Sequence, residues 1–301
     1  GALVQARFWL LGLLFTSLWA GLGLQFVTPP EWRKKLALAS LVILIPAGIA
    51  FENQHGTSQF RDYAKALLEA LPQNSLLLFE GDHAYGALYY DQQVLGVRKD
   101  VQIIHLNFLS RPWSRRWASA NYPTVTIPNK GDGNYGAGGY QLRDLVEANR
   151  SPNREVFVLN SVRAWDKSLE GIFARVPWGM AEWIVPVGMP PIESYRIWKA
   201  ASDQFFSSYS PPWKPGWPLG EQGGQSWENI VAGEYLDSRH NFAVALANQV
   251  QSGNADLTIS REALGHLEYM KPVYPDAHPA FWKNYGLVLN QLLPLEPAYK
   301  P

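Results

Sequence analysis

The chain has 301 residues and no cysteine, and its 26 basic side chains are balanced by 26 acidic ones, so its formal net charge is zero. The lack of cysteine excludes disulfides, thiolate metal sites and cysteine nucleophiles, and the balanced charge gives no reason to expect a nucleic-acid partner. The length allows one large domain or two ordinary ones.

Two apolar runs near the start predict a membrane anchor. Residues 8–27 carry no charge and, as a helix, are long enough to cross a hydrocarbon core of roughly 30 Å. Residues 36–51 contain Pro46 and predict a spanning or half-buried helix. There are two alternatives. The first run could be a signal peptide, or both runs could be core helices of a soluble domain. The basic turn at 31–35 should lie in the cytoplasm, which places everything after Phe51 outside it.

The region after the anchor has the pattern of a Rossmann-like domain with a parallel sheet. A helix is expected over residues 58–71. The short apolar runs 75–79 and 101–106, separated by a helix over 84–95, predict a strand–helix–strand unit. Further expected elements are strands at 124–127 and 155–159, a helix at 140–149 and an edge hairpin over 172–187.

The chain changes character beyond Pro190. Residues 211–224 are rich in proline, glycine and tryptophan and predict a linker. Helices expected over 227–252, 260–273 and 279–293 resemble tetratricopeptide-type pairs, although no full repeat is visible. We therefore divide the chain into two transmembrane helices (1–52), an extracytoplasmic α/β domain (53–190), a linker (191–226) and an all-helical, tetratricopeptide-like tail (227–301).

Polar side chains stand at the ends of the first two predicted strands. Ligands of a parallel α/β sheet bind outside the carboxyl ends of the strands, where Asp82 and His83 are expected, so both are candidate substrate-binding residues. An N-cap role is the alternative for Asp82. His105, inside the second strand, is expected to be a core histidine. Arg98 and Asp100 precede that strand, at the opposite edge of the sheet, where a salt bridge would fix the helix-to-strand turn.

A basic and aromatic cluster follows the second strand. Arg111, Arg115 and Arg116 lie close in sequence to Trp113 and Trp117. Arginine with tryptophan suits a lipid phosphate headgroup at a membrane surface, so the three arginines are further candidate substrate-binding residues. An ordinary solvated turn is the alternative.

Other familiar signatures do not predict a site. Residues 131–136 read GxGxxG, but they neither follow a strand directly nor open a helix, which favours a glycine loop over a nucleotide site. The six histidines show no ligand spacing, and no G-x-S-x-G nucleophile motif occurs. The sequence therefore predicts no metal and no cofactor.

One stretch carries a longer signature. It reads Gly81-Asp82-His83, then YDQQV from Tyr90 to Val94, then GVRKDV from Gly96 to Val101. This pattern resembles glycosyltransferase family 117, the former domain-of-unknown-function family that includes the transmembrane-protein-260-type O-mannosyltransferases. His83 and the turn at 84–86 depart from the residues usual in that family. We assign five residues of this pattern to a structural motif, namely Gly81, Tyr90, Gln92, Arg98 and Asp100.

The resemblance implies a GT-C-type membrane glycosyltransferase, of which this chain would be the C-terminal membrane and extracytoplasmic part. Such enzymes transfer a sugar, here expected to be mannose, from a polyprenyl-phosphate donor to an acceptor, here expected to be a protein. Their catalytic carboxylate lies in an upstream outer loop, so no catalytic residue is assigned in this chain. The expected location is a bacterial inner membrane, with the soluble domain in the periplasm and membrane lipid as a further partner. The alternative is a non-catalytic, membrane-anchored binding or scaffold module.

Overall fold

The computed structural model describes residues 58–293, with gaps at 137, 160–161, 163–165, 190, 212–226, 252–256 and 274–278, and scattered residues between 19 and 42. By their contacts, residues 1–58 and residues 59–301 form two compact units.

The first unit contains the segments that we expected to span a membrane. Most of residues 8–27 and 36–51 lie outside the described residues. None of the helices that the structure describes combines the length and the apolar character needed to cross a bilayer. This finding corrects the predicted fold class, which had two N-terminal transmembrane helices.

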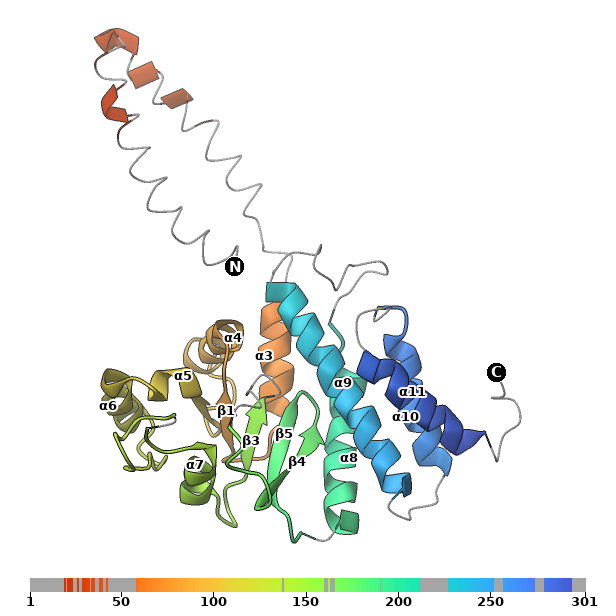
Figure 1. The fold of residues 1–301 in the computed structure, drawn as a ribbon. Helices are drawn as coiled ribbons and strands as arrows, with labels where there is room; N and C mark the ends of the chain where they lie inside the picture. The colour runs from red at the N-terminus through yellow and green to blue at the C-terminus, as the bar shows by residue number, and fades with distance from the viewer. Residues whose placement is uncertain are drawn as a thin grey trace. The chain divides into compact units, whose positions relative to one another are not determined.

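The second unit is built on a five-stranded sheet of order β2-β1-β3-β5-β4 (Figure 1). The central strand β1 (Leu76–Phe79) is parallel to both β2 (Gln102–His105) and β3 (Val156–Leu159). The strand β5 (Ala181–Pro186) pairs antiparallel with β3 and with the edge strand β4 (Phe173–Trp178). The sheet is therefore mixed, which corrects the predicted fold class of a Rossmann-like parallel sheet.

The β4–β5 hairpin, predicted over residues 172–187, is confirmed and makes the sheet mixed. The strand predicted at 124–127 is wrong, because that segment is a loop. The side chain of Asn149 takes the place of a partner strand there. Its Oδ1 accepts from the Thr126 N–H at 2.7 Å, and its Nδ2 donates to the Thr126 carbonyl at 2.8 Å. An amide side chain can satisfy a backbone donor and acceptor at once, so no strand partner is needed.

Helices cover both faces of the parallel strands (Figure 1). Successive side chains of a strand point to opposite faces, so Leu77 and Phe79 of β1 enter one hydrophobic core, whereas Leu76 and Leu78 enter a second. The first core is shared with α3 (Gln59–Ala70) and α4 (Asp82–Gln93), and the second with α5 (Leu106–Leu109), α6 (Pro112–Asn121) and α7 (Leu142–Asn149). The helix α6 was not predicted, because its cluster of arginine and tryptophan resembles a solvated turn.

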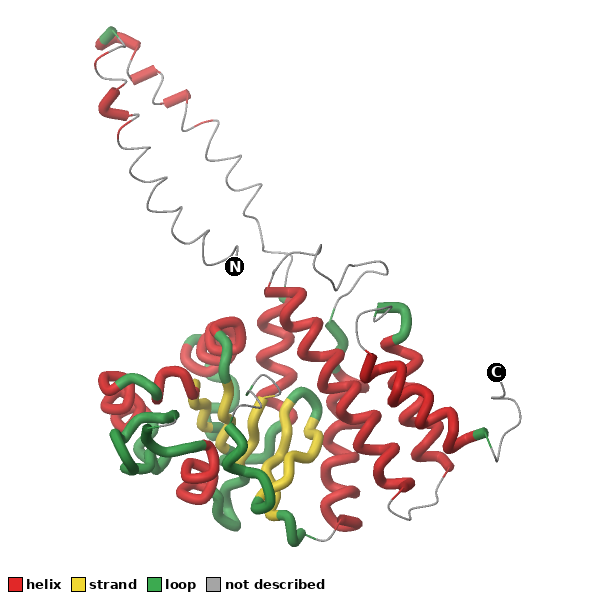
Figure 2. The backbone as a smooth tube through the Cα atoms, viewed as in Figure 1, coloured by secondary structure: helices red, strands yellow, loops and turns green. Residues whose placement is uncertain are grey.

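Four further helices follow β5 in the chain, on one side of the sheet in Figure 2. The first two contact the edge strand β4, and the other two pack against the second of them. The four helices are α8 (Pro191–Ser208), α9 (Trp227–Gln251), α10 (Leu257–Met270) and α11 (Pro279–Leu292). The first of them occupies the start of the predicted linker 191–226, so that part of the linker prediction is wrong; residues 212–226 lie outside the described residues. The first hydrophobic core continues from α3 through the sheet to α11. The tail and the α/β region therefore pack as one unit. A tetratricopeptide-like character of the tail stays a prediction.

Candidate functional site

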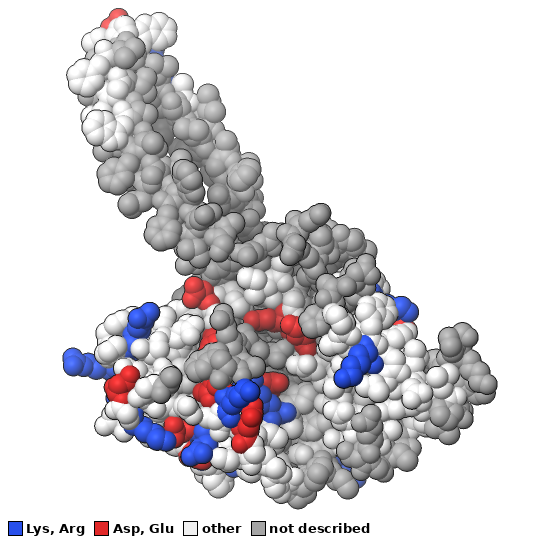
Figure 3. All heavy atoms as spheres, in the orientation of Figure 1, with Lys and Arg blue, Asp and Glu red and all other residues white. Residues whose placement is uncertain are grey.

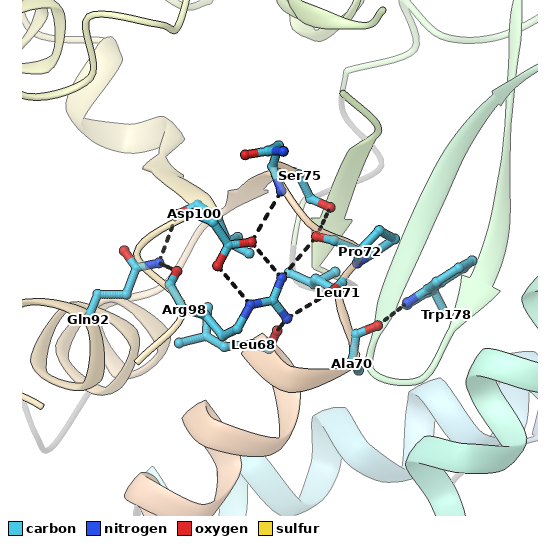
Figure 4. A network of polar contacts seen from close by, with 11 residues as sticks. Leu68, Ala70, Leu71, Pro72, Ser75, Gln92, Arg98, Asp100 and Trp178 are labelled. Carbon is cyan, nitrogen blue, oxygen red and sulfur yellow. Dashed lines mark hydrogen bonds and ion pairs between the residues drawn. The ribbon is translucent and has the colours of Figure 1, made fainter. Parts of the chain in front are cut away.

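Arg98 and Asp100 tie the end of α3 to the start of β2 (Figure 4). Arg98 Nε and Nη2 donate to the two carboxylate oxygens of Asp100, each at 2.8 Å. The same guanidinium donates to the carbonyls of Leu68 at 2.9 Å, Leu71 at 2.8 Å and Pro72 at 3.1 Å. Carbonyls in the last turn of a helix lack partners within the helix, so this network acts as a C-terminal cap. The interpretation of the pair as a structural salt bridge is confirmed.

The network also changes the acidity of Asp100. The hydrogen bonds from Arg98, assisted by the N–H of Asn74, lower the pKa of Asp100 from 3.8 to about 2, although partial burial opposes the shift. A carboxyl whose folded pKa is depressed stabilises the fold above its unfolded pKa, and this contribution is lost as the pH falls through the folded value.

We therefore expect an acid limb of stability between about pH 4 and pH 2. The Asp100→Asn variant should be less stable than the wild type at pH 7 and should lose less of its remaining stability over that window. Thermal unfolding midpoints measured across the window check this expectation. A variant whose midpoint falls with pH in parallel with the wild type would contradict it.

The remaining residues of the structural motif hold the α4–β2 connection and the turn before α4. The Gln92 side chain donates to the carbonyls of Arg98 at 3.0 Å and Val101 at 2.8 Å. The Tyr90 side chain is exposed, while its carbonyl accepts from the N–H groups of Val94 and Leu95. Four of the five motif residues therefore lie in α4 or at the amino edge of the sheet, away from the expected ligand edge. The fifth, Gly81, lies at the carboxyl edge.

Gly81 forms the turn at the carboxyl end of β1. Its φ of +101° lies in a region that L side chains rarely adopt, and a Cβ there would come within 2.7 Å of Cε1 of the His83 ring. Asp82 follows as the first residue of α4 and is exposed. Gly81 is the N-cap, and no side-chain cap bond forms, so the alternative of Asp82 as N-cap is wrong.

His83 faces the helical tail. Its ring is buried, and Nε2 lies 3.0 Å from Oε1 of Glu234 on α9. The other oxygen of Glu234 accepts from the hydroxyl of Tyr63 on α3 at 3.4 Å. Burial, with the charge of Glu234 second, raises the pKa of Tyr63 well above its ordinary value, so the phenol stays protonated as a donor. The structure therefore separates the candidate pair: Asp82 faces solvent, whereas His83 helps to join α4 to α9.

His105 is a core histidine, as predicted. It is 5% exposed and contacts the rings of Phe79, Tyr85 and Phe108. Burial lowers its pKa, so the imidazole is neutral at neutral pH. The arrangement is that of an aromatic cluster beneath the carboxyl edge of the sheet.

The arginines of the basic cluster meet the glycine loop, which we define as residues 131–139. A cavity of about 660 Å³, here called the arginine cavity, is lined by Arg115 and Arg116 of α6 together with Asp132 and Asn134 of the loop. Arg115 Nη1 donates to the Gly133 carbonyl at 3.0 Å, which fixes that guanidinium against the loop. The Arg116 side chain is exposed.

The third arginine of the cluster, Arg111, precedes α6 as its N-cap residue, is exposed and does not line the arginine cavity. Nearby, Trp113 is 65% exposed. On the face drawn in Figure 3, basic and acidic side chains are interspersed. The sequence did not predict that Asp132 and Asn134 line the arginine cavity. The glycine-rich composition of their loop was the signal that could have pointed to them.

A second group of polar side chains lies between α8 and α10. Asp203, Glu262 and His266 place potential metal-ligand atoms within 4.8 Å of one another. However, Lys199 Nζ lies 2.6 Å from Asp203 and 2.7 Å from Glu262. Burial, with the charge of Arg239 second, lowers the pKa of His266 to about 4. Because an ammonium already pairs both carboxylates, this group is best described as an ion-pair contact between the two helices.

Comparison with known proteins supports the predicted resemblance. Residues 60–130, from α3 to the residue before the glycine loop, match the family model described as TMEM260-associated domain 2. A protein O-mannosyl-transferase tmem260 of Dictyostelium discoideum is 24% identical over 225 residues, or 73% of this chain and 27% of that relative. Protein O-mannosyl-transferase TMEM260 of Mus musculus is 23% identical over 321 residues, or 97% of this chain and 43% of that relative. The chain thus spans less than half the length of these relatives. No solved structure matches.

Proposed function

We propose, from the premise that the chain belongs to the TMEM260-type family, that it is part of a glycosyltransferase that attaches mannose to a protein acceptor. The observation that carries this proposal is the match to two relatives named as protein O-mannosyl-transferases, one of which extends over 97% of the chain. We further propose a polyprenyl-phosphate donor, association with membrane lipid, and a location on the periplasmic side of a bacterial inner membrane.

In such a transfer the acceptor hydroxyl attacks the anomeric carbon of the sugar, and the bond from that carbon to the donor phosphate breaks. The hydroxyl proton passes to a general base, and the phosphate leaves with the bonding electron pair. The general base is proposed to lie in a part of the parent protein outside this chain. A cationic group beside the phosphate would stabilise the charge that develops on it.

We assign that electrostatic role to the arginine cavity. Arg115 and Arg116 outnumber Asp132 as charged groups in its lining, so the cavity has a net positive charge. A carboxylate oxygen of Asp132 accepts from the Asn134 N–H at 2.8 Å, which holds this carboxylate within the glycine loop. The exposed indole of Trp113 nearby suits a lipid surface. Arg111 remains a proposed contact to lipid, and Asp82 a proposed contact to substrate at the carboxyl edge.

The test is sugar transfer in membranes that contain the parent protein, with polyprenyl-phosphate mannose as donor. We expect Arg116→Ala to raise the KM for the donor about tenfold, which corresponds to about 1.4 kcal/mol, with a smaller change in kcat. Loss of one charge-assisted hydrogen bond to phosphate explains an effect of this size. Arg143→Ala is the matched control, because Arg143 is a half-buried helical arginine whose guanidinium pairs with Glu147 on α7.

An unchanged KM for Arg116→Ala would remove the arginine cavity from the proposal. The same assay with Asp82→Asn shows whether that exposed carboxylate contacts substrate. If the parent transfers no sugar from any lipid-linked donor, the proposal of a transferase fails and the alternative of a non-catalytic binding or scaffold module is favoured.

A further inference from the structure

A second cavity lies between α3 and α8. Its volume of about 440 Å³ falls within the range of pockets that hold small ligands, roughly 300–1,000 Å³. The apolar part of its lining consists of Ala66 and Ala70 of α3, Ala201 and Phe205 of α8, and Trp178 at the end of β4. We call it the α3–α8 cavity.

Polar side chains from both helices complete the lining. Asp62, Lys65 and Glu69 recur at helical spacing along α3, and Gln204 and Ser208 do so along α8. They offer carboxylate acceptors, ammonium and amide donors, and a hydroxyl that can do both. A ligand in this cavity would therefore meet hydrogen-bond donors and acceptors on both sides and a small apolar surface between them.

Specific contacts fix the walls of the α3–α8 cavity in place. Trp178 Nε1 donates to the Ala70 carbonyl at 2.7 Å (Figure 4), which fixes the indole to α3. The N–H of Gly179 donates to Oγ of Ser202 at 3.1 Å, which fixes the β4–β5 turn to α8. At Gly179, φ is +62° and a Cβ would come within 2.6 Å of Phe205. These contacts indicate that the cavity is preformed.

Tyr209, at the end of α8, adds a buried polar group to the lining. It is 7% exposed, and its hydroxyl has no hydrogen-bond partner among the described residues. Burial, with the charge of Asp62 second, raises its pKa, so the phenol stays protonated at neutral pH. A buried hydroxyl without a partner costs free energy, and a polar ligand would reduce that cost by providing one.

The charges of the lining limit the chemistry of the ligand. α3 contributes two carboxylates and one ammonium to the lining, and the Lys65 ammonium already lies 3.9 Å from Glu69. This excess of negative charge disfavours phosphates and other anions. The polar rim disfavours a purely apolar chain. An uncharged ligand with several hydroxyls can donate to and accept from the polar lining residues. Its C–H surface can lie on the apolar ones, Trp178 and the alanines. We infer that the α3–α8 cavity binds a saccharide unit. This site is separate from the arginine cavity, and the inference holds whether or not the parent transfers mannose.

The test is ligand-observed saturation-transfer NMR on the 301-residue chain in mild detergent, with the methyl glycosides of mannose, glucose, galactose and N-acetylglucosamine. We expect at least one to bind with a Kd on the order of 1 mM. The double variant Gln204→Ala, Ser208→Ala should weaken that binding about tenfold. Ser207→Ala is the matched control, because Ser207 and Ser208 both donate to a carbonyl three residues earlier in α8, yet Ser207 does not line the cavity.

Three outcomes would overturn the inference. Failure of all four glycosides to bind would do so directly. Binding that is unchanged in the double variant would place the saccharide elsewhere. Binding of the polyamine spermidine without any glycoside would show that the two carboxylates select a cation instead. Because Gln204 and Ser208 are exposed, the double variant should fold, and circular dichroism of its thermal unfolding verifies this.

Discussion

Replacing Arg98 by alanine should lower the free energy of unfolding by about 2–4 kcal/mol. The variant loses both hydrogen bonds to Asp100 and one donor to each of three carbonyls at the end of α3. The carbonyls of Leu68 and Pro72 keep a second donor, the Leu71 N–H and the Ser75 hydroxyl. Removal of one partner of a polar network costs more than the network contributes, because the other partners stay desolvated. The Arg98 side chain is 22% exposed, so water can reach part of the site, which limits the effect.

Chemical denaturation of the wild type, Arg98→Ala, Arg98→Lys and Arg143→Ala measures this effect. Arg98→Lys should recover little of the loss, because an ammonium cannot reproduce the planar fork that reaches Asp100 and the carbonyls together. Arg143→Ala should change stability by less than about 0.5 kcal/mol, since it removes only an exposed pair on α7. A loss for Arg98→Ala no larger than that for Arg143→Ala would show that the network does not stabilise the fold.

The second large effect is expected at Trp198 in α8. It is 2% exposed and lies among Tyr195 and Phe242, in the core that joins the helical tail to the sheet. Trp198→Ala should lower the free energy of unfolding by about 3–5 kcal/mol, because it removes buried apolar surface and leaves a cavity that the neighbours fill only in part. Trp113→Ala is the matched control, since that indole is 65% exposed and its loss should cost little.

The same variant tests whether the tail and the α/β region form one cooperative unit. Because the core runs without interruption from α3 to α11, Trp198→Ala should lower the midpoint of a single transition seen by far-ultraviolet and near-ultraviolet circular dichroism alike. A variant that unfolds in two steps, with the tail lost first, would show that the tail is a separate domain, as our division of the sequence at residue 190 predicted.

Local patterns were sufficient to predict most of the α/β elements. Four-residue apolar strands such as β1 and β3, and the hairpin that turns at Gly179, have strong short-range signals. The pairing of Arg98 with Asp100 was also predictable, because the two residues are close in sequence at a helix-to-strand turn. The helix α6 was missed although Pro112 in its first turn is a helix-start signal, because its mostly polar side chains provide little apolar periodicity.

What the sequence by itself determined is therefore local: most of the strands and helices, the turns between them, and a signature that resembles a known family. Only the tertiary structure decided which polar groups meet. It placed His83 against Glu234, 151 residues away, and Trp178 against the Ala70 carbonyl, 108 residues away. It also brought the glycine loop onto α6 and left Asp82 in solvent. Hydrophobic periodicity specifies which face of an element is buried, but the partner of that face depends on the packing of the whole core.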